Sequence, residues 1–303
     1  MHPVLFRIPG IDLPLHTYGV MIVTGFLLAM FVAHRQALRI GELQDEVLDV
    51  AFWALVGGLI GARVVFILVN WRQYFVEQFW DPQLKFLPSF LVVWKGGLVF
   101  YGAALGGLIG FLLFSRSRGL NLRQTLKFAD IVVVGVPLAH VFGRFGCIAA
   151  GCCWGDAMFH IDDGVMVSDI PLAARFPVGS LAYSSLLQTS APEVVSLMRA
   201  AGHTMPLFPS QIAESIGEAL VFLLLLYLRP RKWFHGQVVL LYFMLYPILR
   251  SFLELFRGDA ERGYVIPGVL STSQFISIVV ASCSMAAIVY LRRRGLTKVA
   301  AEP

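Results

Sequence analysis

Apolar residues fill long stretches of this chain, and short polar segments separate these stretches. A helix needs about 20 mostly apolar residues to cross a hydrocarbon core of about 30 Å. Seven stretches meet this requirement, so the pattern predicts an all-α integral membrane protein with seven transmembrane helices. The predicted spans are residues 18–33, 50–69, 96–114, 129–149, 209–228, 236–256 and 268–291.

Composition excludes two other classes of protein. Of the 303 residues, 57% are hydrophobic and 14% are charged, whereas soluble globular proteins carry about 25% charged residues. Too few charges remain to cover a water-exposed surface, so a soluble enzyme is excluded. A disordered chain is excluded as well, because disorder requires low hydrophobicity and high charge.

Basic residues in short loops predict the orientation of the spans, because cytoplasmic loops carry an excess of Lys and Arg. Thirteen of the 24 basic residues lie after the first, third, fifth and seventh spans. The N-terminus is therefore expected outside and the C-terminus in the cytoplasm, and the net charge of +5 gives no reason to expect a nucleic-acid partner. The thirteen residues are Arg35, Arg39, Arg116, Arg118, Arg123, Lys127, Arg229, Arg231, Lys232, Arg292, Arg293, Arg294 and Lys298.

Residues 1–303 are expected to form a single polytopic membrane domain with one insertion. The longest connection, residues 151–208, falls on the predicted outer side, and its apolar pieces are too short to span a membrane. We expect a small, partly helical extracytoplasmic head there, between the fourth and fifth spans. The aromatic-rich segment 70–88 also lies on that side; an aromatic belt at the membrane interface is the favoured interpretation, and a lipid gate is the alternative.

Several charged residues fall inside or at the ends of the predicted spans, where a central Arg or Asp costs about 2.5–3.5 kcal/mol and indicates function. Arg250 and Glu254 are four residues apart, so they share one helix face and can pair, and Tyr246 and Arg257 extend that face. This pair either pins the helix bundle or belongs to a site. The charged residues are Arg63, Asp130, Arg144, Glu214, Glu218, Arg250 and Glu254.

Arg144 favours a site, because it lies in the outer half of its span, near the depth expected for Arg250. A guanidinium is planar and permanently charged, and it suits phosphate oxygens. Two such groups predict a cavity for a phospholipid head group; an ion-pair network without phosphate is the alternative. Arg63 is either a third member or a structural tie, and His16, just before the first span, is a candidate to line the cavity.

Glycines indicate close packing in some places and a ligand in others. Gly57 and Gly61, and likewise Gly102, Gly106 and Gly110, recur every four residues, which allows two helices to approach closely. Other glycines cluster around Arg144, where we expect them to let the backbone bend and approach a ligand. These are Gly143, Gly146, Gly151 and Gly155.

Three of the four cysteines, Cys147, Cys152 and Cys153, lie close to Arg144 in sequence. No histidine stands nearby at metal-ligand spacing, so no metal is expected. Inert thiols, or a disulfide from Cys147 to one of the other two, are the favoured interpretation. A nucleophilic cysteine activated by Arg144 is the alternative. Cys283, in the last span, is interpreted as a small apolar filler.

Ordered motifs occur over nearly the whole length, at residues 15–19, 61–63, 94–102, 143–155, 208–214 and 246–257. Together they resemble the motifs of the prolipoprotein diacylglyceryl transferases. The first three resemble the family's Leu-His-x-Tyr-Gly, Gly-x-Arg and the stretch leading into its His-Gly-Gly element. Residues 143–155 are similar to Gly-Arg-x-Gly-Asn through Asn-Gly-Glu-x-Trp-Gly. Residues 208–214 resemble His-Pro-Ser-Gln-x-Tyr-Glu, and 246–257 resemble Tyr-x3-Arg-x3-Glu-x2-Arg.

The resemblance implies a multi-pass enzyme of the bacterial inner membrane. It would transfer diacylglycerol from phosphatidylglycerol to a cysteine thiol in the lipobox region of a prolipoprotein signal peptide, and it would release glycerol phosphate. It needs no cofactor, its other partners are membrane lipids, and a monomer is expected. The implied catalytic residues are Arg144, Arg250, Glu254, Tyr101 and Tyr18. The implied phosphatidylglycerol-binding residues are Arg144, Arg250, Arg63, Tyr246, Gly155 and His16.

The sequence departs from the family motifs at several positions. Tyr101 and Phe208 replace histidines, Cys147 and Ala150 replace asparagines, and Cys152 replaces a glutamate. Tyrosine, with a pKa near 10, is a poor general base, but a substrate thiol with a pKa near 8.5 needs only modest activation. A divergent transferase is favoured, and a non-catalytic phospholipid-binding protein derived from the family is the alternative. A solute transporter is disfavoured, because the sequence shows no internal repeat.

Overall fold

A computed structural model of the chain describes residues 4–8, 13–41, 43–77, 79–80, 88–91, 97–257, 264–266 and 270–294. In this part of the chain, seven helical segments are long and apolar enough to cross a membrane, which confirms the predicted multi-pass fold. They are α1 (Thr17–Ile40), α2 (Glu46–Val69), α3 (Phe100–Ser117), the pair α4 (Leu122–Val132) and α5 (Val136–Ala150), α8 (Ser210–Leu228) with the 3₁₀ turn η5 (Arg229–Arg231), α9 (Gln237–Glu254) and α10 (Thr272–Arg294).

The first and fourth spans differ most from their predicted bounds. Helix α1 continues to Ile40 and so includes basic residues that were assigned to a loop. Long basic side chains can keep their charge in water while the helix continues beneath them. The fourth span is broken, because the 3₁₀ turn η4 (Val133–Gly135) separates α4 from α5. Pro137 stands in the first turn of α5, where its missing N–H costs no helical hydrogen bond.

The chain divides into two compact units, residues 1–33 with 129–303, and residues 34–128. In the second unit, α2 and α3 pack along their glycines. A Cβ atom added to Gly106 would lie 2.1 Å from the carbonyl oxygen of Gly57, and one added to Gly61 would lie 2.3 Å from the carbonyl oxygen of Gly102. Since real Cβ atoms never approach that closely, the predicted role of these glycines in close packing is confirmed.

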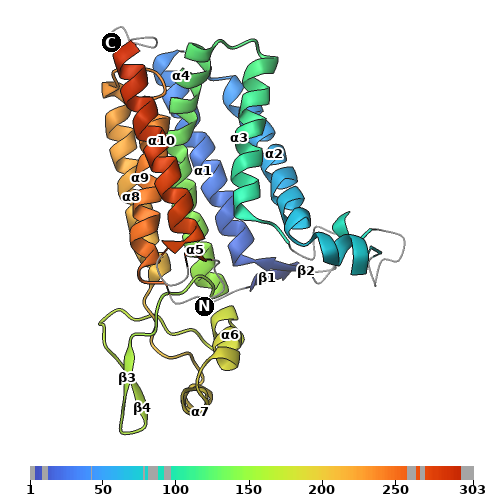
Figure 1. Ribbon diagram of the computed structural model, residues 1–303, viewed down its shortest axis with the longest axis vertical. Helices are drawn as coiled ribbons and strands as arrows, with labels where there is room; N and C mark the ends of the chain where they lie inside the picture. The colour runs from blue at the N-terminus through green and yellow to red at the C-terminus, as the bar shows by residue number, and fades with distance from the viewer. Residues whose placement is uncertain are drawn as a thin grey trace. The chain divides into compact units, whose positions relative to one another are not determined.

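In the first unit, α9 packs against both α8 and α10, and α5 packs against α8 (Figure 1). An apolar core formed by η4, α8 and α9 includes Val134, Val221, Leu225 and Val238. This bundle carries most of the side chains discussed below, because the inward faces of α5, α8 and α9 meet in it.

Asp130 in α4 is fully buried and holds the start of α9. One carboxylate oxygen accepts hydrogen bonds from Lys232 Nζ at 3.2 Å and from the N–H of Gly236 at 2.8 Å. The other oxygen accepts from the N–H groups of Val238 at 2.9 Å and Val239 at 3.1 Å. The first N–H groups of a helix have no partner within that helix, so a carboxylate suits this position.

The predicted head lies between α5 and α8, beyond their adjacent ends (Figure 1). It contains the hairpin β3 (Phe159–Asp162) and β4 (Val165–Ser168), and the helices α6 (Leu181–Thr189) and α7 (Pro192–Ala201). Its own apolar core includes Phe176, Met198 and Leu207. The expected partly helical character is therefore confirmed, whereas its outward orientation stays a prediction.

Short elements complete the described chain. The strands β1 (Val4–Ile8) and β2 (Leu13–His16) form an antiparallel hairpin, as do β5 (Tyr264–Ile266) and β6 (Leu270–Ser271). The aromatic segment contains the π-helical turn η1 (Gln73–Glu77) and leads to the 3₁₀ turn η2 (Ser89–Leu91). There Phe75 stacks on Trp71 and on Phe90, so these rings pack on one another. Whether the segment acts as a belt or a gate stays a prediction, and residues 78 and 81–87 lie outside the described part.

Candidate functional site

The structure contains the predicted polar face of α9, on which Tyr246, Arg250 and Glu254 lie. Arg250 Nη2 donates to Glu254 Oε2 at 2.6 Å, and both side chains are more than 90% buried. The i, i+4 spacing allows this pairing within one helix. Tyr246, one turn earlier on the same helix, interacts electrostatically with Arg250 and also with Arg144. Tyr246 therefore interacts with an arginine of its own helix and with an arginine of α5.

Arg144 is held by a residue to which the sequence analysis gave no role. Its Nη2 donates to Glu214 Oε1 at 2.5 Å, and the Glu214 side chain, on α8, is 3% exposed. Arg257 Nη1 lies 4.0 Å from the other oxygen of Glu214, so this carboxylate stands between two guanidinium groups. Arg144 and Glu214 are 70 residues apart in sequence, and their contact follows from the packing of α5 against α8.

Ion pairs thus join three arginines and two glutamates: Glu214 pairs with Arg144 and Arg257, and Glu254 pairs with Arg250. Each carboxylate fixes at least one guanidinium in place, which limits the side-chain entropy that a bound anion would have to remove. The ionised group carries one surplus positive charge, which equals in magnitude the charge of a phosphodiester. The arrangement can therefore bind a single anion at preorganised guanidinium groups.

Tyr18, at the start of α1, lies beside this cluster. A Cβ atom added to Gly146 would lie 2.9 Å from Tyr18 Cδ2, so the ring packs against α5. Tyr18 also interacts electrostatically with Arg144. His16 is exposed at the end of β2, and its predicted place in a cavity stays a prediction.

Gly155 makes a close approach, but the partner is the protein's own backbone. A Cβ atom there would lie 2.6 Å from the carbonyl oxygen of Phe256 and 2.7 Å from that of Phe208. Its N–H donates to Phe208 O at 3.0 Å. The absence of a side chain is thus explained by packing, and contact with a ligand stays a prediction.

Arg63 and Tyr101 belong to the second unit and are described within it. The Arg63 guanidinium donates to three carbonyl oxygens, those of Phe90 at 2.9 Å, Gly97 at 3.1 Å and Ser89 at 3.2 Å. These bonds support the structural-tie alternative for Arg63. Tyr101, in the first turn of α3, is 49% exposed and contacts the ring of Phe100. Its role in catalysis stays a prediction.

A second polar group within the bundle was not anticipated. His140 lies one turn before Arg144 on α5, and its Nδ1 is 2.9 Å from Glu218 Oε1 and 3.1 Å from the Tyr242 hydroxyl. Glu218 is fully buried. Spacing along each helix gave a weak signal, since His140 precedes Arg144 by four residues and Glu218 follows Glu214 by four. Only the packing of three helices shows that they meet.

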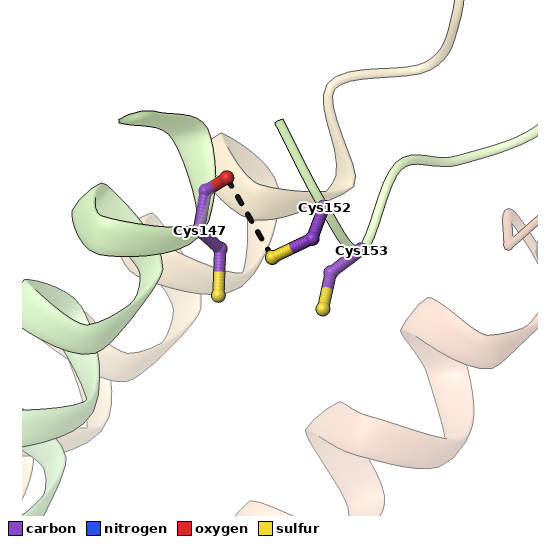
Figure 2. Close-up of side chains that lie close together, drawn as sticks. All are labelled: Cys147, Cys152 and Cys153. Carbon is purple, nitrogen blue, oxygen red and sulfur yellow. Dashed lines mark hydrogen bonds between the residues drawn. The ribbon is translucent and has the colours of Figure 1, made fainter. Parts of the chain in front are cut away.

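The three neighbouring cysteines converge at the end of α5. Gly151 ends this helix in the left-handed conformation, with φ of 68°, and the chain then turns back, so that the N–H of Cys152 donates to Cys147 O at 3.1 Å. Figure 2 shows the sulfur atoms of Cys147, Cys152 and Cys153 gathered together, all within 4.8 Å of one another. All four cysteines of the chain are described, and all are free thiols.

Two buried side chains of α8 hold the backbone of this cysteine loop. Gln211 Nε2 donates to Cys152 O at 2.7 Å, and Ser210 Oγ donates to Cys153 O at 2.6 Å. The pKa of the Cys153 thiol is lowered from its ordinary value, because hydrogen bonds from Cys147 and Cys152, and then the charges of Arg257 and Arg144, favour its thiolate. Two arginines of the site therefore act electrostatically on this cluster.

Comparisons with known proteins show which family this chain is similar to. A family model described as prolipoprotein diacylglyceryl transferase matches residues 3–290. The phosphatidylglycerol–prolipoprotein diacylglyceryl transferase 2 of Clostridium perfringens is 33% identical over 266 residues, which is 88% of this chain and 87% of the relative. The phosphatidylglycerol–prolipoprotein diacylglyceryl transferase of Clostridium tetani is 31% identical over 92% of this chain and 93% of its own length. The like-named protein of Serratia proteamaculans is 30% identical over 96% and 94%.

Proposed function

The chain belongs to the prolipoprotein diacylglyceryl transferase family, and we propose that it transfers the diacylglyceryl group of phosphatidylglycerol to a cysteine thiol of a lipoprotein precursor. The product is a thioether, and glycerol phosphate is released. The protein acts as a monomer in the bacterial inner membrane, with its N-terminus and head outside and its C-terminus in the cytoplasm. The thirteen basic residues of the predicted cytoplasmic loops support this orientation.

The observation that carries this proposal is the pair of arginines that share Tyr246. Arg144 and Arg250 come from different helices, and each is fixed by its own carboxylate, Glu214 and Glu254 respectively. A phosphodiester bound between the guanidinium groups would neutralise the surplus charge of the cluster. Arg257, which lies 4.0 Å from Glu214, strengthens the positive potential.

The same geometry supports chemistry as well as binding. When the acceptor sulfur attacks the glyceryl carbon, the bond from that carbon to the phosphate oxygen breaks, and negative charge accumulates on the departing glycerol phosphate. Preorganised guanidinium groups stabilise such charge more strongly in the transition state than in the bound lipid. Glu214 and Glu254 act as positioning residues, and Tyr18 and Tyr246 line the space around the phosphate.

The test is a transfer assay with the full chain in vesicles that contain radiolabelled phosphatidylglycerol and a lipobox peptide. We expect Arg144→Ala and Arg250→Ala each to lower the rate at least 100-fold, the magnitude that the loss of one transition-state donor produces. Arg175→Ala, which removes an exposed arginine of the head, is the matched control. Wild-type turnover in either site variant would refute the phosphate-site assignment.

Complementation addresses the substrate in cells. We expect the chain to restore growth in bacteria depleted of their own diacylglyceryl transferase. If well-expressed, membrane-inserted protein fails to do so, and purified protein still binds phosphatidylglycerol in an Arg144-dependent manner, the non-catalytic lipid-binding alternative is correct instead.

A further inference from the structure

The three-cysteine cluster is not explained by the binding of a lipid phosphate. Its members occupy two positions, 147 and 152, where the resembled motif has asparagine and glutamate, and the next position, 153. The structure brings their sulfur atoms within 4.8 Å of one another, and the charges of Arg257 and Arg144 act on Cys153. The proposed transfer requires an acceptor thiol to become a thiolate at this site, and the cluster is chemically suited to that step.

The sulfur positions are close to those of a three-thiolate metal site. A zinc–sulfur bond is about 2.3 Å long, so sulfurs at tetrahedral angles around Zn²⁺ lie about 3.8 Å apart. The three Sγ atoms all lie within 4.8 Å of one another. Two sulfur atoms 4.8 Å apart would have to approach each other by about 1 Å to bind one ion. Rotation about the side-chain bonds allows this movement. The sequence suggested no metal because histidine was absent, but three thiolates need no histidine.

Hydrogen bonds from buried side chains hold the backbone around the cluster in place. Gln211 and Ser210, each at most 2% exposed, donate to the carbonyl oxygens of Cys152 and Cys153. Cys153 has a φ of 60°, a conformation that non-glycine residues adopt only when the surrounding structure enforces it. Groups that fix the ligands in this way typically raise metal affinity 10–100-fold.

The charge around the cluster and its accessibility are also compatible with a bound Zn²⁺ ion. Zn²⁺ with three thiolates carries one net negative charge. Arg257 and Arg144 both interact electrostatically with Cys153, so their positive charges would offset the negative charge of the complex. Cys147 is buried, whereas Cys152 and Cys153 are only partly buried. A fourth ligand can therefore approach from the side of the last two cysteines.

We propose that Cys147, Cys152 and Cys153 bind one Zn²⁺ ion as thiolates, and that the fourth coordination position receives the sulfur of the acceptor cysteine. The identity of this fourth ligand rests on the proposed transfer function, whereas metal binding itself does not. Zinc matches the site because it accepts thiolates in four-coordinate geometry and, in catalytic sites, keeps one position for substrate.

The reaction step balances without an additional redox partner. The acceptor thiol binds the ion and loses its proton to water, so the sulfur reaches the lipid as a thiolate. A sulfur electron pair then forms the bond to the glyceryl carbon, and the pair of the breaking carbon–oxygen bond leaves with glycerol phosphate. The neutral thioether is a weaker ligand than a thiolate, so the product can dissociate from the ion.

Metal binding is tested on the purified full chain in mild detergent under anaerobic conditions, with Co²⁺ as the probe. We expect one equivalent to bind and to show the sulfur-to-cobalt absorption band of a tetrahedral thiolate site. Cys152→Ser and Cys153→Ser should weaken binding at least 100-fold, and Gln211→Leu 10–100-fold. Cys283→Ser, which changes an exposed cysteine of α10, is the matched control and should bind as wild type does.

Two outcomes would overturn the metal site. One is a cobalt spectrum that Cys152→Ser and Cys153→Ser leave unchanged. The other is a thiol count below four in protein purified without oxidant, together with no cobalt band, since the cysteines then form a disulfide.

The fourth position is tested with two peptides. A lipobox peptide that contains cysteine should shift the cobalt band, and the same peptide with serine should not; equal effects of the two would refute thiol coordination. Transfer should stop after zinc removal and resume when zinc returns. A metal-binding chain that never transfers would refute the proposed function but not the metal site. Transfer that survives complete zinc removal would refute the role of the metal.

Discussion

Replacing Asp130 with asparagine tests how the first unit is held together at the start of α9. The asparagine oxygen can still accept from the N–H groups of Val238 and Val239. Its NH₂ group would replace the oxygen that faces the Lys232 ammonium and the Gly236 N–H, and both of these are donors. The substitution therefore changes almost no volume but leaves a buried cation and a buried N–H without an acceptor.

The expected magnitude follows from these contacts. The side chains of Asp130 and Lys232 are 0% and 1% exposed, and removal of one partner of a buried ion pair costs about 3–5 kcal/mol. Lys232→Met leaves three N–H donors on Asp130 and should cost about 1.5–3 kcal/mol, the worth of one hydrogen bond to a charged group. In Asp130→Asn with Lys232→Met no buried cation remains, so a loss of about 1–3 kcal/mol is expected from the Gly236 N–H.

The free energies of unfolding would be measured by titrating the protein with SDS in mixed detergent micelles, with circular dichroism as the signal. The double variant should be more stable than Asp130→Asn alone, which is the signature of a coupled pair. A loss below 0.5 kcal/mol for Asp130→Asn, or a double variant no more stable than that single variant, would refute the reasoning.

Three further predictions use the same titration. Gly106→Ala should lower the free energy of unfolding by about 1–3 kcal/mol, because the new Cβ would lie 2.1 Å from Gly57 O. Gly107→Ala is the control and should change it by less than about 0.5 kcal/mol, because its Cβ would lie 3.5 Å from Ala54 O. Equal effects would contradict the packing of α2 on α3. Arg63→Met should cost at least about 2 kcal/mol and leave the KM for phosphatidylglycerol in the transfer assay unchanged, and a raised KM with unchanged stability would instead indicate a head-group ligand. His140→Leu should cost about 1–3 kcal/mol by depriving buried Glu218 of a hydrogen bond, and adding Glu218→Leu should restore part of it; no restoration would show that the two residues are not coupled.

Features that depend on neighbours along one helix could be predicted from the sequence. The seven spans follow from apolar length alone, since a membrane demands about 20 apolar residues whatever the tertiary packing. The Arg250–Glu254 pair follows from the i, i+4 geometry of a helix. The glycines of α2 and α3 predict a close contact, because their spacing places them on one face of each helix. The motif around Arg144 was also recognisable, because its residues are contiguous.

Pairs of polar side chains from different helices could not be predicted, because they depend on how each helix is rotated and how far it is shifted against the next. Arg144 and Glu214 are 70 residues apart, and Asp130 and Lys232 are 102 apart, yet each pair is joined directly. No local spacing distinguishes Glu214, which holds Arg144, from Glu218, which meets His140 one turn away.

The cysteines show the same division at the scale of a single loop. From the sequence, inert thiols or a disulfide were favoured, a nucleophile was the alternative, and no metal was expected. The left-handed turn at Gly151, the strained backbone at Cys153 and the two donors from α8 bring three sulfurs within 4.8 Å. The sequence thus determines which reactive side chains are present. The tertiary structure decides which of them act together, because only folding sets the distances between them.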